Sequence, residues 1–236
     1  MKVLALFSAA LLLVGCPSTD PEPAALSRVQ VIHALDGEPF VYVTANGTTT
    51  LASELPFGAT TGYVQLSAGI QTLAVSNNGA DVWRTQDITT DPDSAYTFLV
   101  VGRSTPSGTS KAVALYSDIV EANPTQARVR FINAAYDLSQ ASVITNIGPA
   151  EYPIPGMQQV LYGATSVSPT TGSPFLNLPA GTYDLRFTAD SSTTVIAQLP
   201  QMTFEAGMIY TLLLGGQQST NSIQAFLLYH QPGVFE

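Results

Sequence analysis

The segment RVQVIHA at residues 28–34 returns as RVRFINA at residues 128–134. Three further pairs of similar segments follow in the same order. These are residues 55–60 with 160–165, 64–69 with 176–181, and 96–102 with 210–216. Four matches in a fixed order are hard to obtain by chance, so they predict that one structural unit is present twice.

The duplication predicts two domains. We expect the first over residues 27–120 and the second over residues 126–232, joined by a linker at 121–125. The second domain is longer because it contains two insertions, Asn146–Gln158 and Ser166–Ser173. Insertions fall on loops, where binding surfaces usually form. These two segments are therefore the expected determinants of specificity.

Within each unit the segments are typical of β-strands. Apolar and polar residues alternate over 183–187, which is the period of a strand with one solvated face. Asn46-Gly47 predicts a tight hairpin, because both residues tolerate positive φ. Residues 98–101 and 212–214 are apolar on both faces, so they should lie centrally or beneath a second layer. No stretch of ten residues has capped helical periodicity. The sequence predicts an all-β protein of two tandem β-sandwiches.

The same residues carry a family resemblance. RVQVIHA at 28–34, Phe57-Gly58, the turn at 66–69 and the strand beginning at Tyr96 resemble the bacterial family called domain of unknown function 4397. The resemblance covers nearly all of the mature chain. It implies secreted or lipid-anchored proteins with such units in tandem, an immunoglobulin-like or related sandwich, and no established activity.

The leader indicates the compartment. A positive start precedes an apolar run over residues 3–14, which is shorter than the roughly 20 residues of a membrane-spanning helix and is typical of a secretory signal. The segment LVGC at residues 13–16 resembles the bacterial lipobox. That resemblance implies cleavage between Gly15 and Cys16 and attachment of diacylglycerol to the Cys16 thiol. The alternative is an ordinary signal peptide in which Cys16 is incidental.

The segment after the cysteine is expected to be a tether. Residues 17–25 contain three prolines and two acidic residues, a composition that favours an extended, solvated chain. We therefore expect a signal peptide at 1–15 and a lipidated cysteine with its tether at 16–26. Pro17 stands where enteric lipoproteins carry the aspartate of an inner-membrane retention signal. This favours the outer membrane of the bacterial cell envelope, with membrane lipid as one partner.

Composition argues against several function classes. The 8 Lys and Arg face 17 Asp and Glu, a formal net charge of −9, whereas nucleic-acid binding depends on clustered basic residues. A single cysteine rules out an internal disulfide framework and any multi-cysteine metal site. The sequence contains no G-x-S-x-G, H-E-x-x-H or Walker-type motif. We expect no catalytic residues, no metal and no cofactor.

Three side chains merit individual interpretation. His33 is in phase with inward-looking Val29 and Val31, and Asn133 takes its place in the second unit. It is either a polar group that ties down the following loop, or a metal ligand or catalytic base, which could then operate in only one unit. His230 follows the last expected strand and should be solvated. Trp83, the only tryptophan, either fills the core or forms an exposed binding platform.

Carboxylates form two tight groups. Asp91-Pro92-Asp93 with Asp87, and Asp36-Gly37-Glu38, could offer oxygen ligands to Ca²⁺. A calcium site needs about six to eight oxygens, and neither group is complete. We therefore interpret these residues as solvated turn acids.

The sequence favours a non-catalytic envelope lipoprotein that presents loops to a protein or polysaccharide. The alternative is a carbohydrate-directed module or weak hydrolase that uses carboxylates. A third hypothesis is a purely structural spacer.

Overall fold

The computed structural model describes residues 25–77, 80–84, 87–104, 110–118, 121–146, 151–189 and 192–230, and these contain strands and no helix. The first unit contains β1 (Leu26–Asp36), β2 (Phe40–Ala45), β3 (Thr49–Pro56), β4 (Val64–Ser67), β5 (Gly69–Gln71), β6 (Leu73–Asn77), β7 (Ala80–Arg84), β8 (Ile88–Thr90), β9 (Ala95–Arg103) and β10 (Ser110–Ser117). The second contains β11 (Gln126–Ala135), β12 (Gln140–Asn146), β13 (Glu151–Pro153), β14 (Val160–Leu161), β15 (Ala164–Thr165), β16 (Leu176–Pro179), β17 (Gly181–Ala189), β18 (Val195–Phe204), β19 (Ile209–Gly216) and β20 (Gln224–His230).

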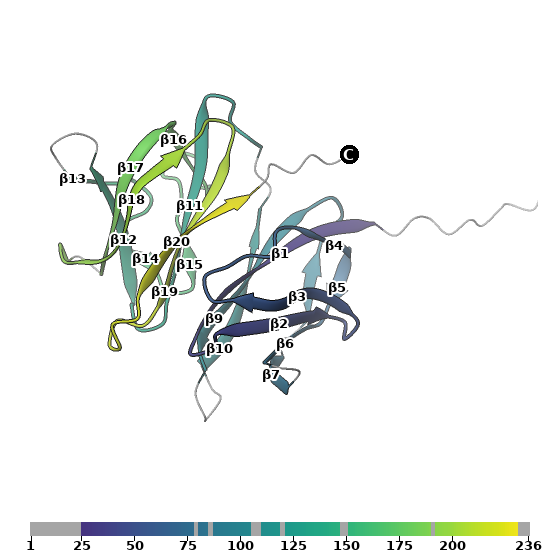
Figure 1. Ribbon diagram of the computed structural model, residues 1–236. Helices are drawn as coiled ribbons and strands as arrows, with labels where there is room; N and C mark the ends of the chain where they lie inside the picture. Colours follow the sequence, from purple (N-terminus) through teal and green to yellow (C-terminus); the bar gives the residue numbers. More distant parts are fainter. Residues whose placement is uncertain are drawn as a thin grey trace, which may run out of the picture.

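Each unit is a sandwich of two sheets (Figure 1). In the first unit the strand orders are β10-β9-β1-β4 and β3-β2-β6-β7, and β5 pairs with β8 in a small third sheet. In the second unit they are β15-β11-β19-β20 and β13-β12-β17-β18, with β16 beside β11 and β14 beside β12. The two main sheets of each unit enclose a separate apolar core. The predicted all-β fold with two tandem β-sandwiches is therefore confirmed.

The duplication is visible in the register of the strands. β1 pairs in parallel with β9, so that Val29 lies opposite Tyr96, and β11 pairs in parallel with β19, so that Val129 lies opposite Tyr210. In both units the glycine that follows an aromatic residue donates its N–H to the first strand. The bonds are Gly58 N to His33 O and Gly163 N to Asn133 O, both 2.8 Å. The repeat alignment thus matches the central strands of the two units, β1 with β11 and β9 with β19.

The Asn46-Gly47 hairpin forms as predicted. Asn46 and Gly47 have φ values of 53° and 71°, the pair of positive values that a two-residue turn between right-twisted strands requires. The Thr48 N–H closes the turn on the Ala45 carbonyl at 3.2 Å.

The strands with two apolar faces lie between two layers, as predicted. On β9, Phe98 and Val100 belong to the core of their own unit, while Leu99 and Val101 face the other unit. We call the surface where the two units meet the seam. Its apolar residues are Ile32, Ala34, Leu99, Val101, Ile132, Ala134, Leu213 and Leu228. Each sandwich therefore supplies the second layer for the other.

A buried polar cluster also crosses the seam. Arg130 of β11 is fully buried and forms an ion pair with Asp118, with Nη1 2.5 Å from Oδ1. Its Nη2 donates to Thr97 at 2.7 Å and its Nε to Thr211 at 2.8 Å. Each of the three guanidinium nitrogen atoms therefore donates to an oxygen atom, as a buried arginine requires.

The other half of this cluster contains His230, for which the prediction of a solvated side chain was wrong. His230 is only 3% exposed. Its Nδ1 lies 2.9 Å from Gln30 Nε2 of the first unit, and its Nε2 lies 2.5 Å from Thr211 Oγ1. His230, the last residue of β20, is covered because the first unit packs over it. Burial and then the charge of Arg130 lower the pKa of His230 to about 3.

The cluster follows the internal symmetry of the duplication. Gln30 and Arg130 are equivalent in the repeat, as are Thr97 and Thr211. Asp118 follows β10 two residues after the partner of Thr97, and His230 stands two residues after the partner of Thr211. Asp118 and His230 are therefore equivalent too. We call these six residues the polar junction. It contains two equivalent contacts, Arg130 with Asp118 and Gln30 with His230, and each contact joins one residue from each unit.

The equivalence predicts a rescue experiment. Arg130→Gln leaves the Asp118 carboxylate buried without its cation and should lower the free energy of unfolding by about 3–5 kcal/mol. Adding Asp118→His converts this half of the junction into a second copy of the Gln30–His230 contact, so the double variant should recover most of the loss. Urea unfolding measures both. A single variant as stable as the wild type would contradict the prediction.

Candidate functional site

The two predicted insertions of the second unit come together around one cavity. The cavity has a volume of about 230 Å³ and lies against the first half of β11 and β16. We call it the insertion pocket. Its lining residues are Arg128, Ile154, Pro155, Ser168, Pro169, Thr170, Thr171, Phe175, Leu176, Asn177 and Leu178.

Close packing of one insertion on the other holds the pocket open. The Val167 N–H donates to the Gly156 carbonyl at 3.2 Å. Gly156 has a φ of +88°, and a Cβ at this position would lie 2.6 Å from the Val167 carbonyl oxygen. Only glycine fits both the backbone conformation and the contact.

A buried serine fixes the second insertion to the sandwich. Ser166 is fully buried, and its Oγ accepts the Phe131 N–H and donates to the Pro174 carbonyl, both at 2.8 Å. Ser168 closes the loop tip, since its N–H donates to the Ser173 carbonyl at 2.7 Å and its carbonyl accepts the Gly172 N–H at 2.9 Å. The loop is therefore an ordered wall of the pocket.

The lining suits binding better than proton transfer. It combines three hydroxyl groups and one amide with proline and aliphatic surface. Arg128 is the one ionisable residue among those that line it, and none of the described lining residues is a histidine or a carboxylate. Such a surface can donate and accept hydrogen bonds but contains no general base. The equivalent Arg28 of the first unit lies outside this pocket because the insertions are absent there.

His33 is a buried loop tie. It is 0% exposed; its Nδ1 accepts the Leu35 N–H at 3.2 Å, and its Nε2 donates to the Glu38 carbonyl at 2.9 Å. Asn133 makes the same two contacts two and five residues onward, to Ala135 N at 3.2 Å and to Leu138 O at 3.5 Å. These bonds fit the loop-tying interpretation, and they use both ring nitrogens.

These contacts predict how stability depends on pH. Burial lowers the pKa of His33 from 6.5 to about 4, so the folded state favours the neutral ring. The resulting stability is complete above pH 6.5 and is lost as the pH falls through 4, by roughly 3 kcal/mol. His33→Asn, which copies the second unit, should keep the stability at pH 7 and flatten this decline in urea unfolding. His230 titrates in both proteins and leaves a residual slope. An unchanged slope would contradict the assignment.

Three of the acidic side chains considered for calcium accept hydrogen bonds within the protein. Asp91 accepts the Tyr96 hydroxyl at 3.1 Å, and Asp87 accepts the Thr72 hydroxyl at 2.5 Å. Glu38 accepts the Asn77 amide at 2.5 Å and also the Ser104 hydroxyl. Within the described ranges no three His, Cys, Asp or Glu residues are grouped as metal ligands.

Two predicted site residues, and the side chain of a third, lie outside the described part of the structure. Gly15 and Cys16 precede residue 25, where the described chain begins. Trp83 lies on β7 opposite Val75, but its side chain is outside the described part, so its facing stays open. Among the residues that the structure describes, none belongs to a helix long and apolar enough to span a bilayer.

The sequence reasoning missed the polar junction. Gln30 and Arg130 stand at matching places in two strands, and each is in phase with the two apolar residues that follow it at positions +2 and +4. This position on the buried face could have revealed the cluster, because a buried polar side chain needs a hydrogen-bond partner. The partner lies in the other unit, and the sequence does not say which residue it is.

The family model for "Domain of unknown function (DUF4397)" matches residues 27–143 and 155–233. The chain belongs to this family. The DUF4397 match covers both units, and its interruption at residues 144–154 overlaps the first insertion of the second unit. No curated protein matches the chain in sequence.

Several solved structures resemble this DUF4397 protein weakly. A proposed cell adhesion protein from Bacteroides uniformis has 9% identity and a TM-score of 0.30, with 87% of this chain and 99% of that one covered. A family 26 carbohydrate-binding module from Eubacterium rectale Amy13K, solved with maltoheptaose, has 11% identity and a TM-score of 0.23, with 89% and 100% covered. A leucine-rich repeat protein from Bacteroides thetaiotaomicron has 12% identity and a TM-score of 0.21; 83% of this chain is covered, but it spans only 26% of that protein. Resemblances this weak carry no argument about function.

Proposed function

We propose that this protein is a non-catalytic, lipid-anchored component of the bacterial cell envelope that binds a protein or polysaccharide through the insertion pocket. The observation that carries the proposal is the asymmetry of the duplication. Both units have the same central strands, but only the second has the two insertions. Residues of both insertions line one ordered pocket. Loops added to a rigid scaffold are a common way to create a binding surface.

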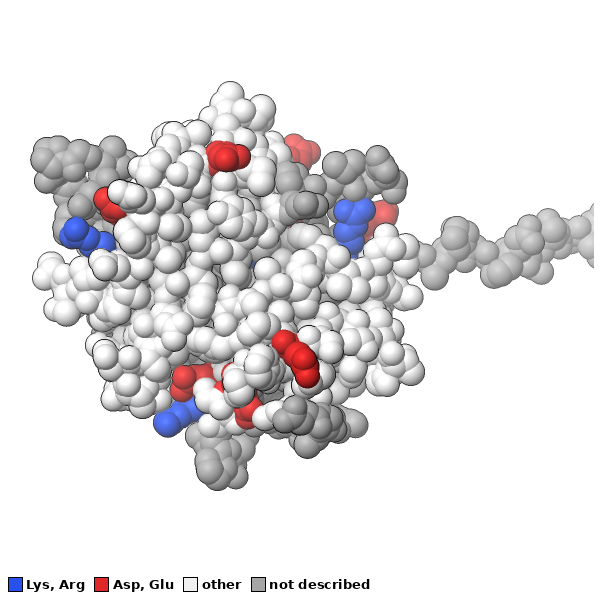
Figure 2. Space-filling model, in the orientation of Figure 1, with Lys and Arg blue, Asp and Glu red and all other residues white. Residues whose placement is uncertain are grey.

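The character of the surface supports a ligand that is not a nucleic acid. Figure 2 shows acidic and basic side chains scattered around the rim of one face, with a broad uncharged surface between them. Hydroxyl, amide and arginine groups at the insertion pocket can bind the hydroxyl groups of a polysaccharide or the polar backbone of a peptide. The absence of an acid–base pair at this pocket is the basis for proposing binding without turnover.

The lipobox supports the proposed location. Two or three acyl chains on Cys16 would hold the protein on a membrane, since each buried CH₂ contributes about 0.8 kcal/mol. Residues 17–25 would then separate the sandwiches from the lipid surface. Pro17 favours the outer membrane.

A carbohydrate-directed module or weak hydrolase that uses carboxylates is the second candidate, and a structural spacer is the third. Every described strand lies within residues 26–230, so the fragment 24–236 contains all of these strands and lacks Cys16. A turnover screen on this fragment separates the first two, because specific hydrolysis abolished by one carboxylate substitution would defeat the binding proposal.

The duplication provides a matched pair of variants for the insertion pocket. Arg128→Gln should weaken capture of the polysaccharide or crosslinked partner at least tenfold, which is about 1.4 kcal/mol, because it removes donors from the pocket. Arg28→Gln changes the equivalent arginine outside the pocket and should leave capture unchanged. A glycan array and crosslinking in intact cells provide the readouts. Equal losses in the two variants would point to a general effect on the sandwich and contradict the site.

The anchor has its own test. Cys16→Ser removes the thiol that accepts diacylglycerol, so the full chain should remain unprocessed or become soluble. Cell fractionation and mass spectrometry of the N-terminal peptide measure this. A variant that fractionates with membranes like the wild type, together with an unmodified Cys16 in the wild type, would refute the proposed localisation.

A further inference from the structure

A second cavity opens at one end of the seam, away from the insertion pocket. Its volume is about 220 Å³. The first unit contributes the loop after β1 and the turn after β3, and the second unit contributes the start of β20. We call it the seam pocket. Its lining residues are Asp36, Gly37, Glu38, Pro39, Phe57, Ser222 and Gln224.

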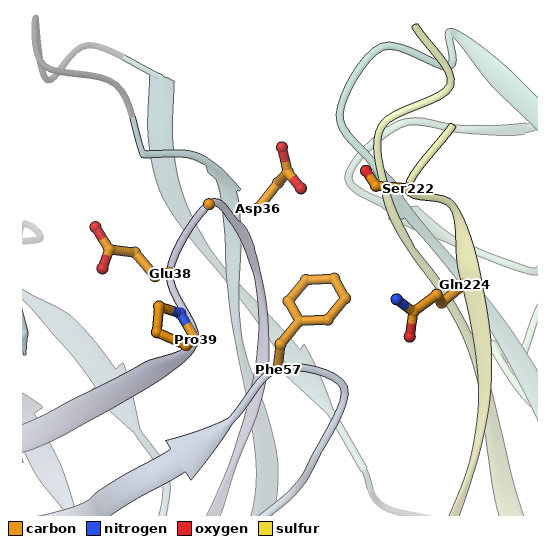
Figure 3. A pocket seen from close by; sticks show the side chains of 7 residues that line it. Asp36, Glu38, Pro39, Phe57, Ser222 and Gln224 are labelled. Carbon is orange, nitrogen blue, oxygen red and sulfur yellow. The ribbon is translucent and has the colours of Figure 1, made fainter. Parts of the chain in front are cut away.

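The seam pocket exists where the two units differ. Tyr136 takes the place of Asp36 in the second unit, and Tyr162 takes the place of Phe57. Tyr136 packs edge-on against Tyr162, with ring centroids 6.1 Å apart. The shorter Asp36 gives Phe57 no such cover, and in Figure 3 the Phe57 ring lies between Asp36 and Gln224. One aromatic ring of a symmetric pair is therefore left facing a cavity.

The Phe57 ring is held rigidly. It packs edge-on against His33 and Phe226, with centroids 5.6 and 5.7 Å away. Gly215 of β19 allows the ring to approach the second unit, since a Cβ at this position would lie 3.1 Å from it. A ring fixed from three sides offers a preorganised stacking surface.

The polar groups around the ring are of two kinds. The Glu38 carboxylate is bonded to Asn77 and Ser104, and the Ser222 Oγ accepts the Gln217 N–H at 3.0 Å. By contrast, the Asp36 carboxylate and the Gln224 amide point toward the space between the units in Figure 3. Arg103 lies 3.9 Å from Asp36 and partly offsets its charge.

We propose that the seam pocket binds one sugar ring of a neutral saccharide. The apolar C–H face of a pyranose packs on Phe57, whose ring attracts polarised C–H groups. Asp36 accepts hydrogen bonds from neighbouring hydroxyl groups, and Gln224 both donates and accepts. The partial charge compensation by Arg103 disfavours a cationic ligand. The volume is below the roughly 300 Å³ at which drug-sized sites begin, so a single ring fits.

This site is additional to the proposed function, because it is separate from the insertion pocket and requires both units at once. Its ligand contacts come from the first unit through Asp36 and Phe57 and from the second through Gln224. The seam pocket therefore depends on the polar junction, which fixes one unit on the other.

The test uses amide NMR of fragment 24–236 titrated with methyl glycosides of glucose, galactose, mannose and N-acetylglucosamine. We expect at least one glycoside to give saturable shifts at the Gly37 N–H and the Gln224 side-chain amide. Asp36→Tyr fills the cavity with the residue that the second unit uses at this position, and it should weaken that binding at least tenfold. Gln224→Ala should weaken it as well, without filling the cavity.

Gln198→Tyr, on an exposed part of β18, is the matched control and should leave the shifts unchanged. The proposal is overturned if no glycoside shifts Gly37 and Gln224, if Asp36→Tyr leaves the shifts intact, or if methylammonium binds there in place of the glycosides. Arg128→Gln, which changes only the insertion pocket, should leave the glycoside-induced shifts of Gly37 and Gln224 unchanged. Loss of binding at the seam pocket can therefore be distinguished from loss of binding at the insertion pocket.

Discussion

The buried ion pair between Arg130 and Asp118 fixes how the two sandwiches pack against each other. Both side chains are almost completely buried, and moving two such charges out of water costs several kcal/mol each. That cost is offset only when each charge has its partner and its remaining hydrogen bonds. Thr97 and Thr211 complete the set from both units. The geometry therefore fixes one relative placement of the sandwiches, which apolar packing alone would specify less strictly.

The equivalent contact between Gln30 and His230 shows how a duplicated interface can diverge. One half of the polar junction is ionic and the other is neutral, yet both occupy equivalent places on the strands. The neutral half lies next to a buried cation, which together with burial holds the pKa of His230 low. A strongly shifted histidine often marks a catalytic site. Here burial is the main cause of both low pKa values, and both rings make structural contacts, so these pKa values are no argument for catalysis.

Much of the fold was predictable because short-range sequence patterns determine it. Alternation, the Asn46-Gly47 turn and the repeat itself specify strands, a hairpin and two equivalent sandwiches. The apolar character of β9 and β19 on both faces even required a second layer. The parallel pairing of β1 with β9 was not predictable in this way, because it joins residues about seventy positions apart. The wrong prediction for His230 has the same cause, since its burial is created by Gln30 of the other unit.

The two candidate sites differ in the same way: one could be anticipated from the sequence of a single unit, and the other depends on contacts between the units. The insertions were visible by comparing one unit with the other, and their convergence on Arg128 follows from where those loops leave the strands. The seam pocket was not visible, because its walls come from the loop after β1 and the start of β20. Phe175 links these levels of structure: it lines the insertion pocket, and its ring centroid lies 4.8 Å from the Arg130 guanidinium carbon. This wall of the insertion pocket therefore packs directly on the charged group that joins the two units, so the polar junction supports the insertion pocket as well as the seam pocket.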